Sequence, residues 1–123
     1  MADGDYTILV IEDDLPTREL YERELRLCYH VVTCDSEEQA LKLLHEHVVA
    51  AVVLEPTLPD GQGWHLLAHI RATPHLHSVP IILCSTQNAR RRAMTLGATI
   101  YLTKPVLPAT LLETLRHVVP SAS

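Results

Sequence analysis

Five short apolar runs constrain the fold of this chain more than any other feature of its sequence. Each run is rich in Val, Ile or Leu and is followed by a segment whose apolar residues recur with a helical period. Continuous apolar runs of this kind are typical of strands buried on both faces, which occur in parallel sheets covered by helices. The alternation predicts an α/β fold with an open, doubly wound parallel sheet. The predicted strands lie at 7–11, 31–34, 50–54, 80–84 and 100–103.

Length and composition favour one domain. The chain has 123 residues, of which 47% are hydrophobic, and this suits a single core. We expect the domain to span 7–119, with an N-terminal tail at 1–6 and a C-terminal tail at 120–123. No apolar run is long enough for a membrane span and the N-terminus is acidic rather than signal-like, so we expect a cytoplasmic protein without membrane contact.

The charge and the cysteines exclude two further classes. The formal net charge is -5, and direct nucleic-acid binding normally requires an excess of Lys and Arg. The three cysteines are odd in number and each lies in an apolar context, which favours buried free thiols over a disulfide framework or a metal site. These residues are Cys28, Cys34 and Cys84.

Polar and charged residues follow four of the predicted strands at the point where each strand ends. Glu12 and Asp13 follow the first strand, Glu55 the third, Ser85 the fourth and Lys104 the fifth. In open α/β sheets the functional site lies outside the carboxyl ends of the strands, so these side chains should converge. Carboxylates, a hydroxyl and an ammonium at one rim fit a phosphoryl-accepting site, which needs an oxygen nucleophile, ligands for a divalent cation and donors for phosphoryl oxygens.

With these residues the sequence resembles the receiver domain of two-component response regulators, from about Thr7 to Val119. The resemblance is carried by Val10-Ile-Glu-Asp-Asp14, by the loop Leu58-Pro-Asp-Gly-Gln-Gly63 and by Tyr101-Leu-Thr-Lys-Pro105. It implies a flavodoxin-like (βα)5 fold with strand order 2-1-3-4-5.

The resemblance also implies a role for each site residue. The Glu12 and Asp13 carboxylates and the Thr57 backbone carbonyl correspond to metal ligands. Ser85, with Thr86 beside it, corresponds to the switch hydroxyl, Tyr101 to the switch aromatic and Lys104 to the lysine that contacts the phosphoryl group. Helix 88–96, the fifth strand and the last helix correspond to the output face, on which Arg90, Arg91 and Arg92 are candidate partner contacts; plain solvent exposure of these arginines stays open.

The chain departs from the family at the phosphoacceptor, where Glu55 replaces Asp. One added methylene moves the carboxylate by ~1.5 Å, and a misplacement of about 1 Å can cost ~10²-fold in rate. Pro56 is a second departure, because the family uses the backbone N–H after the acceptor to hold the phosphoryl group and proline has none. We expect Glu55 to pair with Lys104 or to accept from Ser85. Whether it imitates a phosphoryl group in part or is vestigial stays open.

The favoured function is a non-enzymatic, phosphorylation-independent signalling module that binds a histidine kinase or a downstream effector protein. The alternatives are a weakly phosphorylatable response regulator and a structural dimerisation domain. No cofactor is required, weak Mg²⁺ binding is expected, and the oligomeric state is a monomer or a weak homodimer. His65 and His69 have the i, i+4 spacing of a metal-binding pair, but their position opposite Trp64, Leu67 and Ile70 favours a solvated helix face.

Overall fold

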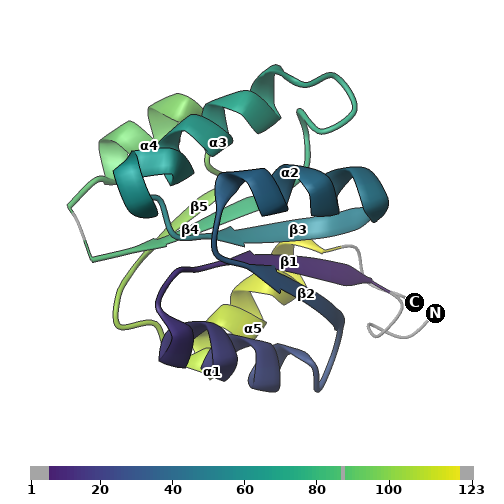
Figure 1. The fold of residues 1–123 in the computed structure, drawn as a ribbon. Coiled ribbons are helices and arrows are strands. Elements are labelled where there is room, and N and C mark those ends of the chain that lie inside the picture. Colours follow the sequence, from purple (N-terminus) through teal and green to yellow (C-terminus); the bar gives the residue numbers. More distant parts are fainter. Residues whose placement is uncertain (1–5, 87, 120–123) are drawn as a thin grey trace.

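The structure is a computed structural model that describes residues 6–86 and 88–119. Its centre is a parallel sheet of five strands in the order β2-β1-β3-β4-β5, as Figure 1 shows. This confirms the predicted fold class and strand order. Of the predicted tails, 1–5 and 120–123 lie outside the described residues. The strands are β1 (Thr7–Ile11), β2 (His30–Cys34), β3 (Val49–Leu54), β4 (Ile81–Ser85) and β5 (Ile100–Thr103).

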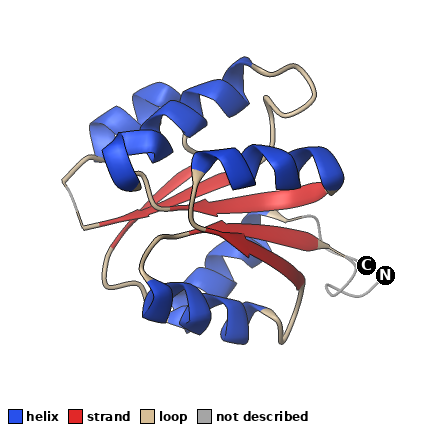
Figure 2. Ribbon diagram, in the orientation of Figure 1, coloured by secondary structure: helices blue, strands red, loops and turns tan. Residues whose placement is uncertain are grey.

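Helices cover both faces of the sheet (Figure 2). One face packs against α1 (Leu15–Leu25) and α5 (Pro108–Val118), and the other packs against α2, α3 and α4. Alternate residues of each buried strand enter the two cores; for example, Leu9 and Ile11 lie in one and Ile8 and Val10 in the other. The second group of helices consists of α2 (Glu37–Glu46), α3 (Gln62–Ala72) and α4 (Arg90–Leu96).

Two helix ends follow clear local sequence signals. Ser36 caps α2 by accepting from the Gln39 N–H at 3.2 Å, and Gly97 ends α4 in the left-handed conformation that glycine favours. Leu27 continues the apolar spacing of Leu20, Tyr21 and Leu25, which predicts a buried side chain. This prediction is wrong, because α1 ends at Leu25 and Leu27 is 76% exposed. Cys28 is half-buried rather than buried for the same reason, although all three cysteines are free.

Arg71 connects three segments that are distant in the sequence. Its guanidinium donates to the Gly97 carbonyl at 2.7 Å and to the Val79 carbonyl at 2.7 Å. It also reaches the Thr99 hydroxyl at 3.3 Å. These bonds hold the segments that precede β4 and β5 beside the end of α3. They fix the ends of these two strands that lie opposite Ser85 and Lys104.

The β3–α3 connection is tight because a glycine lies against the backbone of Pro56. Gly63 is buried in the first turn of α3, and a Cβ atom placed on it would lie 2.4 Å from the Pro56 Cα. The preceding turn has positive φ at Asp60 (62°) and at Gly61 (70°). The loop after Glu55 is therefore pressed onto the start of α3, which limits where the Glu55 carboxylate can lie.

We predict that Gly63→Ala destabilises the protein by about 3 kcal/mol, because the atom that would be displaced belongs to the backbone and cannot rotate away. Chemical denaturation measures this free energy. Ala68→Ser, at an exposed position of the same helix, is the control and should change the free energy of unfolding by less than ~0.5 kcal/mol. Equal effects of the two substitutions would show that the close approach at Gly63 does not constrain the loop.

Candidate functional site

The candidate site lies at the carboxyl edge of the sheet, where the backbone still follows the strand ladder. The Glu12 N–H donates to the Cys34 carbonyl at 3.0 Å, and the Glu55 N–H donates to the Ile11 carbonyl at 2.9 Å. The Lys104 N–H donates to the Ser85 carbonyl at 2.8 Å. Because these three residues continue the hydrogen bonding of β1, β3 and β5, their side chains start from fixed positions.

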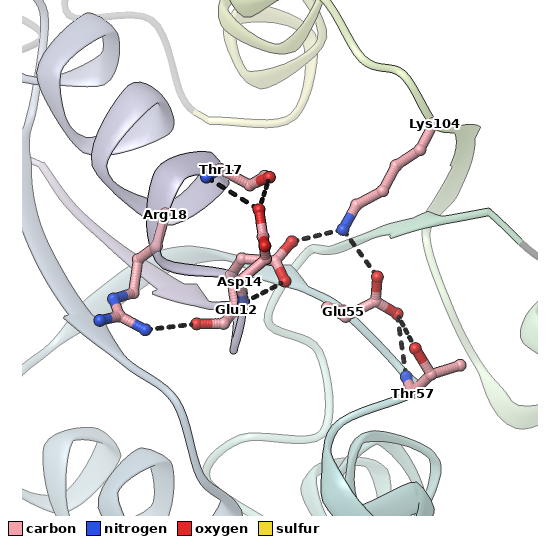
Figure 3. Close-up of polar contacts among 7 residues, drawn as sticks. All are labelled: Glu12, Asp14, Thr17, Arg18, Glu55, Thr57 and Lys104. Carbon is pink, nitrogen blue, oxygen red and sulfur yellow. Dashed lines mark hydrogen bonds and ion pairs between the residues drawn. The ribbon is translucent and has the colours of Figure 1, made fainter.

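The Lys104 ammonium joins the two buried carboxylates of the site. Its Nζ donates to Glu12 Oε1 at 2.5 Å and to Glu55 Oε1 at 2.7 Å (Figure 3). The Glu12 and Glu55 side chains are 3% and 6% exposed, and Lys104 is 14% exposed. The predicted pairing of Glu55 with Lys104 is therefore present, and it connects residues that are 49 positions apart in the chain.

The second carboxylate oxygen of Glu55 is bound by Thr57. Glu55 Oε2 accepts from the Thr57 backbone N–H at 2.9 Å and from the Thr57 hydroxyl at 2.8 Å (Figure 3). Proline at position 56 offers no N–H, so the next residue supplies the local donors. Both oxygens of the Glu55 carboxylate thus accept hydrogen bonds from this chain.

Glu12 is held from three directions. Besides the Lys104 contact, its Oε2 accepts from the Asp14 N–H at 3.1 Å. The Arg18 guanidinium donates to its backbone carbonyl at 2.8 Å. Asp14 in turn caps α1, since its carboxylate accepts from the backbone N–H and hydroxyl of Thr17 (Figure 3). The start of α1 is thereby attached to the site.

The electrostatics of the site follow from two carboxylates that share one ammonium. Burial raises the pKa of Glu12, and the charge of Glu55 adds to that effect against the opposing Lys104. For Lys104, burial lowers the pKa, but the hydrogen bonds and charges of the two glutamates outweigh it, so that its pKa is raised. The site therefore holds a protonated lysine between two buried carboxyl groups.

The other predicted site residues differ in how deeply they are buried around Glu12, Glu55 and Lys104. Ser85 is fully buried at the end of β4, whereas Asp13, Thr86 and Thr57 lie on the exposed side of the rim. The structure thus brings Glu12, Glu55 and Lys104 into direct contact and leaves Asp13 outside that contact.

Tyr101 is buried, and its hydroxyl accepts from the Ala89 N–H at 3.2 Å, just before α4 begins. The structure separates the three consecutive arginines of α4. The Arg90 guanidinium lies 5.2 Å from the Tyr101 ring centre, and the Arg92 guanidinium lies 4.2 Å from the Trp64 ring centre. Arg90 therefore lies beside β5 and Arg92 beside α3.

Of the residues implied as Mg²⁺ ligands, Glu12 already accepts from Lys104, and Asp13 is exposed outside that contact. Mg²⁺ requires an octahedral shell of oxygen atoms with free lone pairs. Glu12 and Glu55 direct one oxygen each at Lys104, and their other oxygens accept from backbone N–H groups. Across 6–86 and 88–119, no group of three or more His, Cys, Asp or Glu side chains is arranged to hold a metal ion.

The histidine pair on α3 lies on an exposed face, as predicted. His65 and His69 have ring centres 6.5 Å apart, and His65 Nδ1 contacts a carboxylate oxygen of Glu37 on α2. The opposite face, with Trp64, Leu67 and Ile70, is buried. His65 thus contributes to the packing of α3 beside α2.

Sequence reasoning missed the roles of two residues that shape the site. Asp14 was part of the acidic motif, but its role as the α1 cap could have been read from its place before Pro16. The donors of Thr57 carried no sequence signal, because they depend on the path of the β3–α3 loop.

Comparisons with known proteins identify the family. A family model for the response regulator receiver domain matches residues 8–116. The chain is 31% identical over 107 residues to the two-component response regulator ORR3 of Oryza sativa subsp. indica, covering 83% of this chain and 82% of that relative. It is 33% identical over 118 residues to the two-component response regulator ARR2 of Arabidopsis thaliana, covering 91% of this chain and 17% of the relative.

Solved structures agree with this result. The receiver domain of a sensor histidine kinase from Pseudomonas aeruginosa, which has a magnesium ion coordinated in its active site cleft, superposes with a TM-score of 0.84 at 28% identity and covers 94% of this chain and 98% of its own. The chemotaxis response regulator CheY4 of Vibrio cholerae has a TM-score of 0.85 at 24% identity, covers 93% of this chain and 98% of its own, and supports the fold alone.

The class defined by this fold and site is a signalling module of two-component systems. The chain belongs to the response regulator receiver domain family. Among the helices in the described part of the chain, none is long and apolar enough to cross a membrane.

We predict that Lys104→Met destabilises the protein by about 3 kcal/mol at pH 7, because two buried carboxylates then face each other without a cation. The native pKa of Glu12, which burial already raises, should rise further once the lysine is removed. A carboxyl with a raised native pKa adds stability below its unfolded pKa, and this is lost as the pH rises through the native value. The variant should therefore approach the wild type near pH 4 and fall behind it towards pH 7.

Denaturant unfolding at both pH values measures this effect. Lys42→Met is the matched control, because its ammonium is 77% exposed and lies 3.9 Å from Glu46 on the surface. It should cost less than ~1 kcal/mol at either pH. A loss for Lys104→Met that is as small as the control, or that is independent of pH, would contradict the proposed role of the lysine between the two glutamates.

Proposed function

We propose that this receiver domain signals through protein contacts without accepting a phosphoryl group. The observation that carries this proposal is the Glu55 carboxylate, which replaces the family's phosphoacceptor Asp and accepts from Lys104 at 2.7 Å. In the family that lysine contacts the phosphoryl group. In this chain Lys104 already donates a hydrogen bond to the Glu55 carboxylate.

The geometry around Glu55 supports loss of the phosphoacceptor role. A nucleophilic oxygen attacks through a lone pair directed at phosphorus. Glu55 Oε2 accepts two hydrogen bonds from Thr57, and Oε1 is directed at Lys104. Proline at position 56 removes a donor for the developing charge of the transferred group. Ser85 and Lys104 keep the positions of the switch hydroxyl and the phosphoryl-binding lysine. The surroundings of the site are thus retained while its chemistry is altered.

The Glu55–Lys104 pair is proposed to replace part of the phosphoryl contact permanently. Two charges at about 4 Å attract by ~4 kcal/mol at an effective dielectric constant near 20, and desolvation offsets much of this gain. A carboxylate offers less charge and one oxygen fewer than a phosphoryl group. The buried Tyr101, bound to the start of α4, fits a switch that is held in one position. The Glu55 carboxylate would therefore imitate only part of the charge of a phosphoryl group, but it would be present at all times.

The proposed contact surface is the face formed by α4, β5 and α5, with Arg90 beside Tyr101 as its cation. The partner would be a histidine kinase or a downstream effector protein in the cytoplasm. Mg²⁺ is not required for this function and would bind weakly, since Glu12 and Glu55 are committed to Lys104. The functional unit would be residues 7–119.

We predict that phosphotransfer chemistry can be restored in two steps. Glu55→Asp shortens the side chain and should give weak labelling by acetyl phosphate and Mg²⁺. Adding Pro56→Ala restores the missing N–H without adding volume at this buried position, so the double variant should label ~10²-fold faster than Glu55→Asp alone. Intact-mass spectrometry over time measures the adduct. The wild type and Pro56→Ala alone should show none.

Pro59→Ala in the Glu55→Asp background is the matched control, because it removes a proline three residues further along the same loop. A stoichiometric adduct at Glu55 of the wild type would overturn the proposal in favour of a weakly phosphorylatable regulator. Equal rates for the single and double variants would show that Pro56 is not a second lesion.

A further inference from the structure

The side of α4 that faces α3 carries a groove that the proposed function does not use. It is an open groove of about 700 Å³, lined by Asn88, Ala89, Arg91, Arg92, Thr95 and Leu96. Residues with this spacing lie along one side of a helix. The lining combines the small or apolar side chains of Ala89, Thr95 and Leu96 with two guanidinium groups at its edge.

Arg92 is held in place at this groove. Its guanidinium lies 4.2 Å from the ring centre of Trp64, and that ring is fixed because Trp64 is only 6% exposed. An arginine stacked on an aromatic face loses little further freedom on binding and still offers its N–H groups to a carboxylate. Arg90, two residues earlier, lies over Tyr101 on another side of α4. The groove is therefore distinct from the face of α4, β5 and α5.

The groove lies in a half of the sequence that carries basic side chains but no acidic ones. Residues 61–112 contain five Lys or Arg and no Asp or Glu. The remaining residues carry all 15 acidic side chains together with the other five basic ones. Lys104 is committed to the glutamates of the site and Arg71 to backbone carbonyls, which leaves the arginines of α4 as the exposed cations of this half.

We propose that this groove binds an acidic amphipathic segment of a partner protein. An apolar side chain of the segment packs on Ala89 and Leu96, and its carboxylates accept from Arg91 and Arg92. Charge complementarity selects an acidic ligand, and the apolar lining selects a peptide over a nucleic-acid backbone, which offers no such side chain. The site is separate from Glu55 and from the Arg90 side of α4, so this proposal does not depend on the proposed function.

The test uses a fluorescein-labelled 16-residue helical peptide with Glu at i and i+4 around two Leu residues. Fluorescence anisotropy at 50 mM NaCl should give saturable binding that weakens as salt rises. Arg91→Glu and Arg92→Glu should each weaken it at least ~10-fold, and Leu96→Gln should weaken it without changing the salt dependence. The control is Arg23→Glu on α1, which should leave the affinity unchanged. Thermal melting confirms that each variant is folded.

Matched probes distinguish the proposed acidic segment from other possible occupants of the groove. A peptide with Gln for Glu and a peptide with Ala for Leu should both lose affinity. Binding that is unaffected by Arg91→Glu and Arg92→Glu, or that is lost only in Arg90→Glu, would overturn the assignment of this groove as the binding site. The proposed function would not be affected by that result. Tighter binding of a single-stranded oligonucleotide through the same arginines would overturn the assignment to a protein segment. Sedimentation showing a dimer of the wild type that Arg91→Glu dissociates would assign the groove to a second copy instead.

Discussion

The Lys104 ammonium is the contact on which the carboxyl edge of the sheet depends. It joins Glu12 after β1 with Glu55 after β3, and it does so from the end of β5. Removing the ammonium would leave two buried carboxylates in repulsion, and such a loss is far more costly than a surface ion pair. The same contact that stabilises the edge also occupies the groups that a phosphoryl group would need. Under the proposed function, stability and loss of phosphotransfer have one cause in this chain.

The length of the Glu55 side chain decides how the site is used. The added methylene carries the carboxylate towards Lys104, while Thr57 binds the oxygen that points back to the loop. The loop cannot move away to relieve this arrangement, because Pro56 lies against Gly63 at the start of α3. The receiver fold thus keeps its switch residues in place around an acceptor that is already satisfied.

Much of this organisation could be predicted from the sequence because strands in a parallel sheet place their ends together. The apolar runs located all five strands, and the polar residues after them located the site and the Glu55–Lys104 pair. The sequence could not predict the Thr57 donors or the contact of Arg92 with Trp64, since these depend on loop paths and helix packing. The apolar spacing of α1 predicted a buried side chain at Leu27, but this residue is exposed. The apolar pattern continues in the sequence beyond Leu25, where the backbone leaves the helix.

The most direct test of the central claim is whether the wild-type site accepts a phosphoryl analogue. Amide ¹⁵N–¹H spectra recorded before and after addition of Mg²⁺ and beryllofluoride report on Ser85, Tyr101 and Lys104 in one experiment. If Lys104 and Thr57 already satisfy the Glu55 carboxylate, these amides keep their positions at saturating beryllofluoride. A second set of resonances for the same residues in slow exchange would show that Glu55 is a functional acceptor, which would contradict signalling without phosphorylation.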